Sequence, residues 1–188
     1  AGTIAVSEFS NTGNLNFDAG SFEIASGISF ANAAGGTLQI DATSGLSNVF
    51  SNTSWTNDGL VNLTTDTDSQ FGRIIGAAGT TITNSATGTF LLDGAATLNV
   101  FSGVICDFQN DGLLSVVKGG VLGNGSDKTI INSGPTDIST GALFEITPGS
   151  GGGFLNVACG PLTLTGAFLG CTSGTSPNDG QPRQRTRS

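Results

Sequence analysis

The feature that most constrains this chain is a motif that occurs seven times along its 188 residues. Each copy has an aromatic residue or isoleucine, one spacer, an asparagine, a short gap, a glycine and then apolar residues at alternate positions, as in Phe9, Asn11, Gly13, Leu15 and Phe17. The seven asparagines are Asn11, Asn32, Asn57, Asn84, Asn110, Asn132 and Asn156. They are 21 to 27 residues apart. A fixed motif at variable spacing predicts a solenoid whose coils keep their strands while one loop changes length.

Alternation of apolar and polar residues predicts three short strands in each coil. One strand follows the glycine, as at residues 13–17, and a second follows in several coils, at residues 20–24, 98–100 and 144–146. The third is the run into the asparagine, as at residues 28–30, 80–82 and 106–108. We therefore predict an all-β fold, a single-stranded right-handed parallel β-helix of about seven to eight coils of 21–27 residues. Residues 2–6 would supply half of an eighth copy. An antiparallel sandwich also has short strands joined by Gly/Asn turns, but it gives no reason to repeat one residue-specific motif.

Each position of the motif has a physical role in such a solenoid. Alternate apolar residues should point into the bore and stack on their equivalents about 4.8 Å away in the next coil. The aromatic positions should then form a stack of Phe9, Phe30, Trp55, Phe108 and Phe154. Asparagines at the turn can bond to one another and to turn backbone, forming a structural ladder. The glycine permits a positive φ and close backbone approach.

Two stretches carry a family resemblance: Asn11-Thr-Gly13-Asn-Leu15-Asn-Phe17 and Asn110-Asp-Gly112-Leu-Leu114-Ser-Val116. They resemble the Asn-x-Gly-x-Leu/Ile-x-Val rungs of bacterial secreted β-helix proteins, the autotransporter passengers and filamentous-haemagglutinin-like adhesins. The resemblance covers residues 1 to about 168. It implies an extracellular or cell-surface protein, either compact and independently secreted or a segment of a longer surface protein.

Composition excludes several kinds of chemistry. The chain has no histidine, so it has no Ser-His-Asp or Cys-His nucleophile and no histidine-ligated metal. Its net charge of −8 opposes binding to nucleic acid and to anionic membranes. Apolar runs of only a few residues do not allow a transmembrane helix. We expect no cofactor.

An enzyme is the main alternative, because polysaccharide lyases and hydrolases also use β-helices. Lyases use an Arg or Lys base beside acidic calcium ligands, and Arg73 follows Asp66 and Asp68 closely in sequence. Asp127, in a Gly-Asn-Gly-Ser-Asp segment, is a further calcium candidate. A solvated arginine among loop carboxylates and an ordinary polar turn are the simpler interpretations.

The cysteines and the C-terminus concern the end of the solenoid. Cys159 and Cys171 lie in the final coil, where a disulfide could stabilise the end, whereas Cys106 should face the bore as a small buried hydrophobe. We expect a β-helix domain at residues 1–171 and a flexible basic tail at residues 172–188, because the tail has prolines and arginines but no apolar pattern.

The sequence thus predicts a non-catalytic extracellular structural or adhesive β-solenoid, with a polysaccharide-active enzyme or its fragment as the alternative. Partners should be a surface glycan or protein, a longer parent chain, or other copies joined through the end coils as a head-to-tail filament. An ice-binding solenoid is a third interpretation. It needs a regular threonine ladder, and the candidates are broken in several coils: Thr37, Thr89, Thr97, Thr136 and Thr163.

Overall fold

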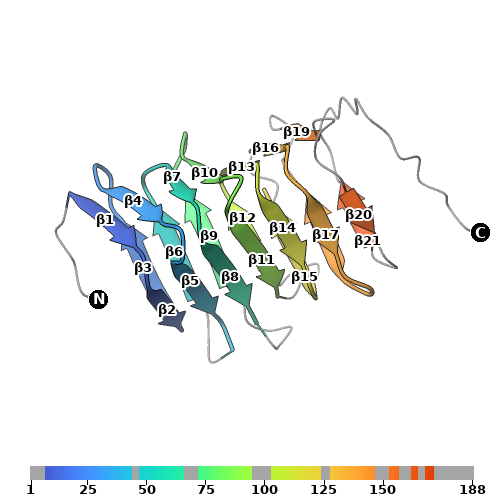
Figure 1. Cartoon of the computed structure of the whole chain (residues 1–188), viewed down its shortest axis with the longest axis horizontal. Coiled ribbons are helices and arrows are strands. Elements are labelled where there is room, and N and C mark those ends of the chain that lie inside the picture. Colours follow the sequence, from blue (N-terminus) through green and yellow to red (C-terminus); the bar gives the residue numbers. More distant parts are fainter. Residues whose placement is uncertain are drawn as a thin grey trace, which may run out of the picture.

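The computed structural model describes residues 7–43, 47–65, 72–94, 103–123, 128–146, 153–156, 162–164 and 168–171 (Figure 1). Beyond Ile146, Leu155 is the one residue whose side chain it describes. Every regular element in these ranges is a β-strand. The strands form three parallel sheets whose coils follow one another along the long axis, from blue at the N-terminal end to red (Figure 1).

The three sheets have seven strands each, and consecutive strands in the chain go to different sheets. Sheet A contains β1 (Glu8–Asn11), β4 (Ser29–Asn32), β7 (Trp55–Asn57), β10 (Thr81–Asn84), β13 (Asp107–Asn110), β16 (Thr129–Asn132) and β19 (Gly153–Asn156). Sheet B contains β2 (Asn14–Asp18), β5 (Thr37–Asp41), β8 (Leu60–Thr64), β11 (Thr89–Asp93), β14 (Leu113–Val116), β17 (Thr136–Ile138) and β20 (Leu162–Leu164). Sheet C contains β3 (Gly20–Ile24), β6 (Ser47–Ser51), β9 (Gly72–Gly76), β12 (Gly103–Ile105), β15 (Gly119–Leu122), β18 (Leu143–Ile146) and β21 (Phe168–Cys171).

One strand from each sheet makes a coil, so the first coil is β1–β3 and the seventh is β19–β21. Each strand pairs in parallel with its equivalent in the next coil, and motif positions pair with themselves. Phe9 faces Phe30 and Asn11 faces Asn32 across the first coil interface. This architecture confirms the predicted parallel β-helix. The half-copy expected at residues 2–6 lies outside the described residues.

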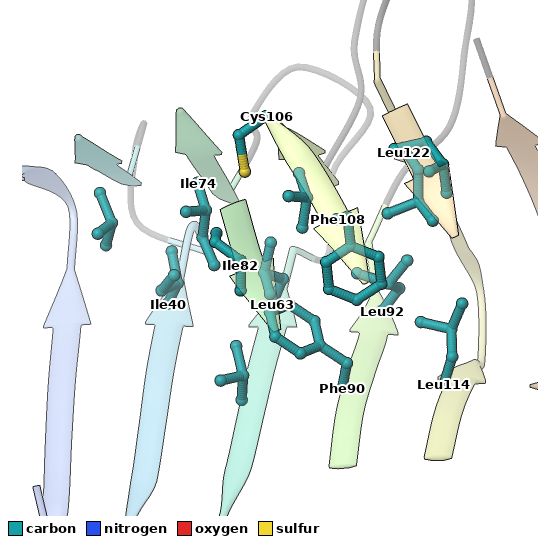
Figure 2. Close-up of a cluster of buried hydrophobic side chains, with 14 of the residues drawn as sticks. Ile40, Leu63, Ile74, Ile82, Phe90, Leu92, Cys106, Phe108, Leu114 and Leu122 are labelled. Atoms are coloured by element: carbon teal, nitrogen blue, oxygen red, sulfur yellow. The ribbon is translucent and has the colours of Figure 1, made fainter. Parts of the chain in front are cut away.

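The core fills the bore between the three sheets. Strands such as β5 and β11 alternate buried and half-buried residues, because successive side chains of a strand point to opposite faces. Figure 2 shows Ile74 of sheet C, Ile82 of sheet A and Phe90 of sheet B meeting inside, each 0% exposed. Burying side chains of this size contributes roughly 1.5–3 kcal/mol each, so the stacked apolar columns are the main source of stability.

The aromatic column is shorter than the sequence suggests. Phe9 stacks on Phe30 at a ring distance of 5.8 Å, and Phe30 packs edge to face on Trp55 at 5.0 Å. Ile82 takes the next position in the column. Phe108, one coil further, packs its ring edge to face at 5.0 Å on Phe90, which belongs to sheet B. Aromatic packing therefore changes from stacking along the axis to contact across the bore.

One predicted strand lies outside the described residues, and the start of another set of strands needs correction. In the fourth coil the described sheet C strand is β12 at Gly103–Ile105, paired with β9 and β15, whereas the strand predicted at Leu98–Val100 lies outside the described residues. The strands predicted to begin at residues 28, 80 and 106 each begin one residue later, at Ser29, Thr81 and Asp107, and Cys106 lies at the bend before β13. Alternation alone does not fix where a strand begins, because the residue before the strand can continue the apolar pattern.

Candidate functional site

The longest polar network of the described structure is a column of amides at the corner between sheets A and B. We call it the asparagine ladder: Asn11, Asn32, Asn57, Asn84, Asn110 and Asn132. Each asparagine ends its sheet A strand two residues after an inward-facing apolar residue, so strand alternation points its side chain inside. From Asn11 to Asn110, each Nδ2 donates to the Oδ1 of the next asparagine, at 2.7–2.8 Å. Exposure falls from 7% at Asn11 to 0% at Asn32, Asn57 and Asn84.

The ladder also satisfies the backbone of the neighbouring coil. The Nδ2 groups of four asparagines donate a second hydrogen bond, at 2.9–3.1 Å, to the carbonyl oxygens of Thr37, Leu60, Thr89 and Leu113. Buried carbonyls without a partner are costly. Asparagine suits the position because its amide supplies two donor hydrogens and an acceptor oxygen. Aspartate would lack the two donor hydrogens, and leucine would lack the donors and the acceptor oxygen.

Glycines at the end of the same turn allow the coils to approach. At Gly36, Gly59, Gly88, Gly112 and Gly134, an added Cβ would lie 2.1–2.2 Å from a carbonyl oxygen of the preceding coil. We call these five the coil-contact glycines. None of them has a positive φ, so close approach, and not a left-handed turn, is the reason for glycine here. The expectation that the motif glycine is needed for a positive φ was therefore wrong at these five positions.

The enzyme candidate Arg73 lies on the outer face of sheet C. Its register neighbours are Asn48 in β6 and Gly103 in β12. Partial burial lowers the pKa of the Arg73 guanidinium from its ordinary value, because desolvation disfavours the charged form. Its expected acidic companions Asp66 and Asp68 lie outside the described residues, as does Asp127. Within the ranges that the structure describes, no three His, Cys, Asp or Glu side chains gather as a metal site.

The outer face of sheet B carries polar rows that the repeat pattern did not reveal. Gln39 donates to Thr64 at 2.9 Å and accepts from Asn62 at 2.9 Å. Thr64 donates in turn to Asn62 at 3.2 Å. This closed triangle spans two coils. Motif analysis missed it because these residues differ from coil to coil, although a row of amide and hydroxyl residues at one register position was a usable signal.

An acidic row lies beside this triangle. Asp18, Asp41 and Asp93 occupy one register position of sheet B, with Thr64 between the last two. Lys118 forms an ion pair with Asp93 at 3.3 Å. Because the Lys118 side chain is 55% exposed, solvent screening leaves the pair a small contribution to stability. The row gives the outer face of sheet B a negative character.

The cysteines separate into two groups. Cys106 is 0% exposed inside the bore, as predicted. Burial raises the pKa of its thiol to about 12, since desolvation disfavours the thiolate. Cys171 ends β21, in register with Ile146, but its side chain and all of Cys159 are outside the described part. The expected disulfide therefore stays a prediction.

The threonine candidates do not form a continuous outer ladder in the described coils. Thr37 and Thr89 share a register position on sheet B, but Leu60 separates them. Thr136 pairs with Leu114 and is 3% exposed, so it belongs to the interior. Thr97 and the side chain of Thr163 are not described. The interruption by Leu60 and the burial of Thr136 argue against a flat ice-binding face.

The class defined by this architecture is a parallel β-solenoid held by an internal asparagine ladder. In the described ranges, no helix has the length and apolar character needed to cross a membrane. Comparison with known proteins adds no narrower group: no family model, curated protein or solved structure matches the chain.

Proposed function

We propose that this chain is a non-catalytic extracellular scaffold, a structural or adhesive β-solenoid presented at a cell surface or built into an extracellular fibre. The observation that carries the proposal is the asparagine ladder, five consecutive amide–amide hydrogen bonds in the interior of the solenoid. The buried asparagine side chains of the ladder are thus used for hydrogen bonds that join one coil to the next.

The composition supports the same proposal. A chain without histidine lacks the most common general base near neutral pH. The described bore holds large apolar side chains, such as Phe90, Phe108 and Phe144, at 1% exposure or less. A partner would therefore use the outer faces or the ends. The resemblance of the rungs to secreted β-helix adhesins agrees with an extracellular location.

A polysaccharide-active enzyme is the second candidate, and the specific observation in its favour is Arg73. Partial burial lowers the pKa of the Arg73 guanidinium, which is the direction that a base requires, but an arginine stays protonated near neutral pH. The surroundings argue less for it, because its two register neighbours are an amide and a glycine. The expected acidic ligands, Asp66 and Asp68, lie outside the described residues.

One experiment separates the two candidates. The purified chain is incubated with acidic polysaccharides and calcium, and unsaturated uronide products are followed by ultraviolet absorbance. We expect no turnover by the wild type. Turnover that Arg73→Ala abolishes and the control Lys118→Ala retains would overturn the scaffold proposal. Localisation is tested separately, by protease and antibody access to the protein on intact cells.

A further inference from the structure

The first coil has the features of an interior coil although no coil precedes it in the described residues. Strands β1, β2 and β3 are the terminal strands of the three sheets at this end. In a parallel pair, alternate residues of a strand direct their N–H and C=O groups to the opposite side. A terminal strand therefore offers a row of unpaired groups to another strand.

Gly13 gives the most specific sign of a missing neighbour. It holds the motif position of the five coil-contact glycines, each of which clears a carbonyl oxygen of the preceding coil. At Gly13 an added Cβ would meet nothing within 4 Å among the described residues, and its φ is not positive. Nothing described therefore requires glycine at this position. A coil stacked on this face would require it.

Two further features of the first coil agree. The side chains of Phe9, Leu15, Phe17 and Phe22 are half-buried, whereas their register partners Phe30, Leu38, Ile40 and Val49 are at most 4% exposed. Asn11 also begins the ladder. Its Oδ1 receives the Gly13 N–H at 3.2 Å, whereas the Oδ1 of each later member accepts an amide from the coil before it. The first coil thus offers apolar surface and an amide oxygen.

We propose that this face binds the seventh coil of a second copy of the chain, so that copies stack head to tail. The seventh coil is suited to it because β19, β20 and β21 are the terminal strands at the opposite end of the same sheets. It also places an asparagine, Asn156, in register with Asn132. Stacking in this sense extends all three sheets with parallel strands and repeats the interface that joins the coils within one chain.

The direction of the ladder selects this geometry over a symmetric dimer. All five amide–amide bonds run from Nδ2 of one coil to Oδ1 of the next. Two first coils facing each other would oppose two acceptor oxygens and make the paired strands antiparallel. A head-to-tail contact opposes a donor and an acceptor. Such a contact is heterologous and does not close, so it gives a linear fibre.

In the described residues, β1, β2 and β3 have four or five residues each and pair only with the second coil. The inference rests on the scaffold proposal for its biological role, because an end-to-end fibre is a form that an extracellular structural protein takes.

Gly13→Ala tests the interface without touching the interior of one chain. Among the described residues of one chain the new methyl group meets nothing within 4 Å, whereas in the stack it would overlap a carbonyl oxygen, as at the five coil-contact glycines. Sedimentation velocity over a wide concentration range measures association, and thermal unfolding checks the fold. The matched control is Ser10→Ala, an exposed position of β1 on the outer face.

We expect the wild type and Ser10→Ala to form a concentration-dependent series of linear multiples. Gly13→Ala should weaken association at least about tenfold with an unchanged unfolding temperature. Association that Gly13→Ala does not weaken would overturn the proposal. So would a wild type that stays monomeric at every concentration, and a coil N-terminal to this segment in a longer polypeptide would then be the remaining occupant. If the protein stays monomeric and cleaves no glycan, only the stacking proposal fails. If it forms a fibre and cleaves glycan, only the scaffold proposal fails.

Discussion

Removing one amide from the middle of the asparagine ladder should destabilise the whole solenoid. Asn84 is 0% exposed. Its Nδ2 donates to Asn110 Oδ1 at 2.7 Å and to the Leu113 carbonyl oxygen at 3.1 Å, and its Oδ1 accepts from Asn57 at 2.8 Å. A net hydrogen bond contributes about 1 kcal/mol, and a buried group left without a partner costs roughly 1–3 kcal/mol. We therefore expect Asn84→Ala to lower the free energy of unfolding by about 3–5 kcal/mol.

That loss is a large fraction of the roughly 5–15 kcal/mol that stabilises a typical domain. Urea unfolding can be followed by fluorescence of Trp55, the one tryptophan of the chain, which is 4% exposed in the folded state. Asn11→Ala should cost less, because it weakens one coil interface where Asn84→Ala weakens two. Gln109→Ala, on the outer face of the next coil, should change stability by less than about 1 kcal/mol. Equal losses for the three variants would refute the ladder as a stabilising element.

Three other outcomes follow from the packing. Phe108→Ala, at a position 1% exposed, should cost roughly 3–5 kcal/mol, and Phe9→Ala in the half-buried first coil should cost less; equal shifts in thermal unfolding would contradict the stacked-coil account. Gly88→Ala should cost at least about 2 kcal/mol, because its Cβ would lie 2.2 Å from the Asn57 carbonyl oxygen, and urea unfolding of the variant measures this. Burial raises the pKa of Cys106 to about 12, above its unfolded value of about 8.5, so the thiol stabilises the fold fully below that value and the contribution is lost as the pH rises towards 12. Between about pH 8 and pH 11 the wild type should thus lose more stability than Cys106→Ala, and parallel pH profiles would show that the thiol is not buried in solution.

The motif was enough to predict the coils, because the same residue type must recur wherever each coil stacks on an identical environment. Asn32 and Asn57, for example, each meet an asparagine on both sides. Register, the parallel arrangement and the interior position of the apolar columns follow from that recurrence. Burial of Cys106 was also predictable, because it alternates with Phe108 in the sequence.

Features that differ between coils were not predictable in the same way. Packing of Phe90 on Phe108 depends on the distance across the bore between two sheets, which sequence spacing does not encode. The strand Gly103–Ile105 was not predicted, because alternation indicated a strand at Leu98–Val100, which lies outside the described residues. The Gln39, Asn62 and Thr64 triangle needs the register of two outer rows. Asp66, Asp68, Asp127 and Cys159 lie outside the described residues, so their expected roles stay predictions.

The orientation of the hydrogen bonds has a mechanical consequence. In a parallel β-helix the bonds between strands and the ladder amides all run along the axis, so a force that pulls the two ends apart acts on one coil interface at a time. A coil contains about 24 residues, and a fully extended chain spans at most about 3.3–3.6 Å per residue. Each interface that yields would release roughly 80 Å of chain while the coils behind it stay folded. Under tension the molecule would lengthen in steps and dissipate work, as an extensible tether does.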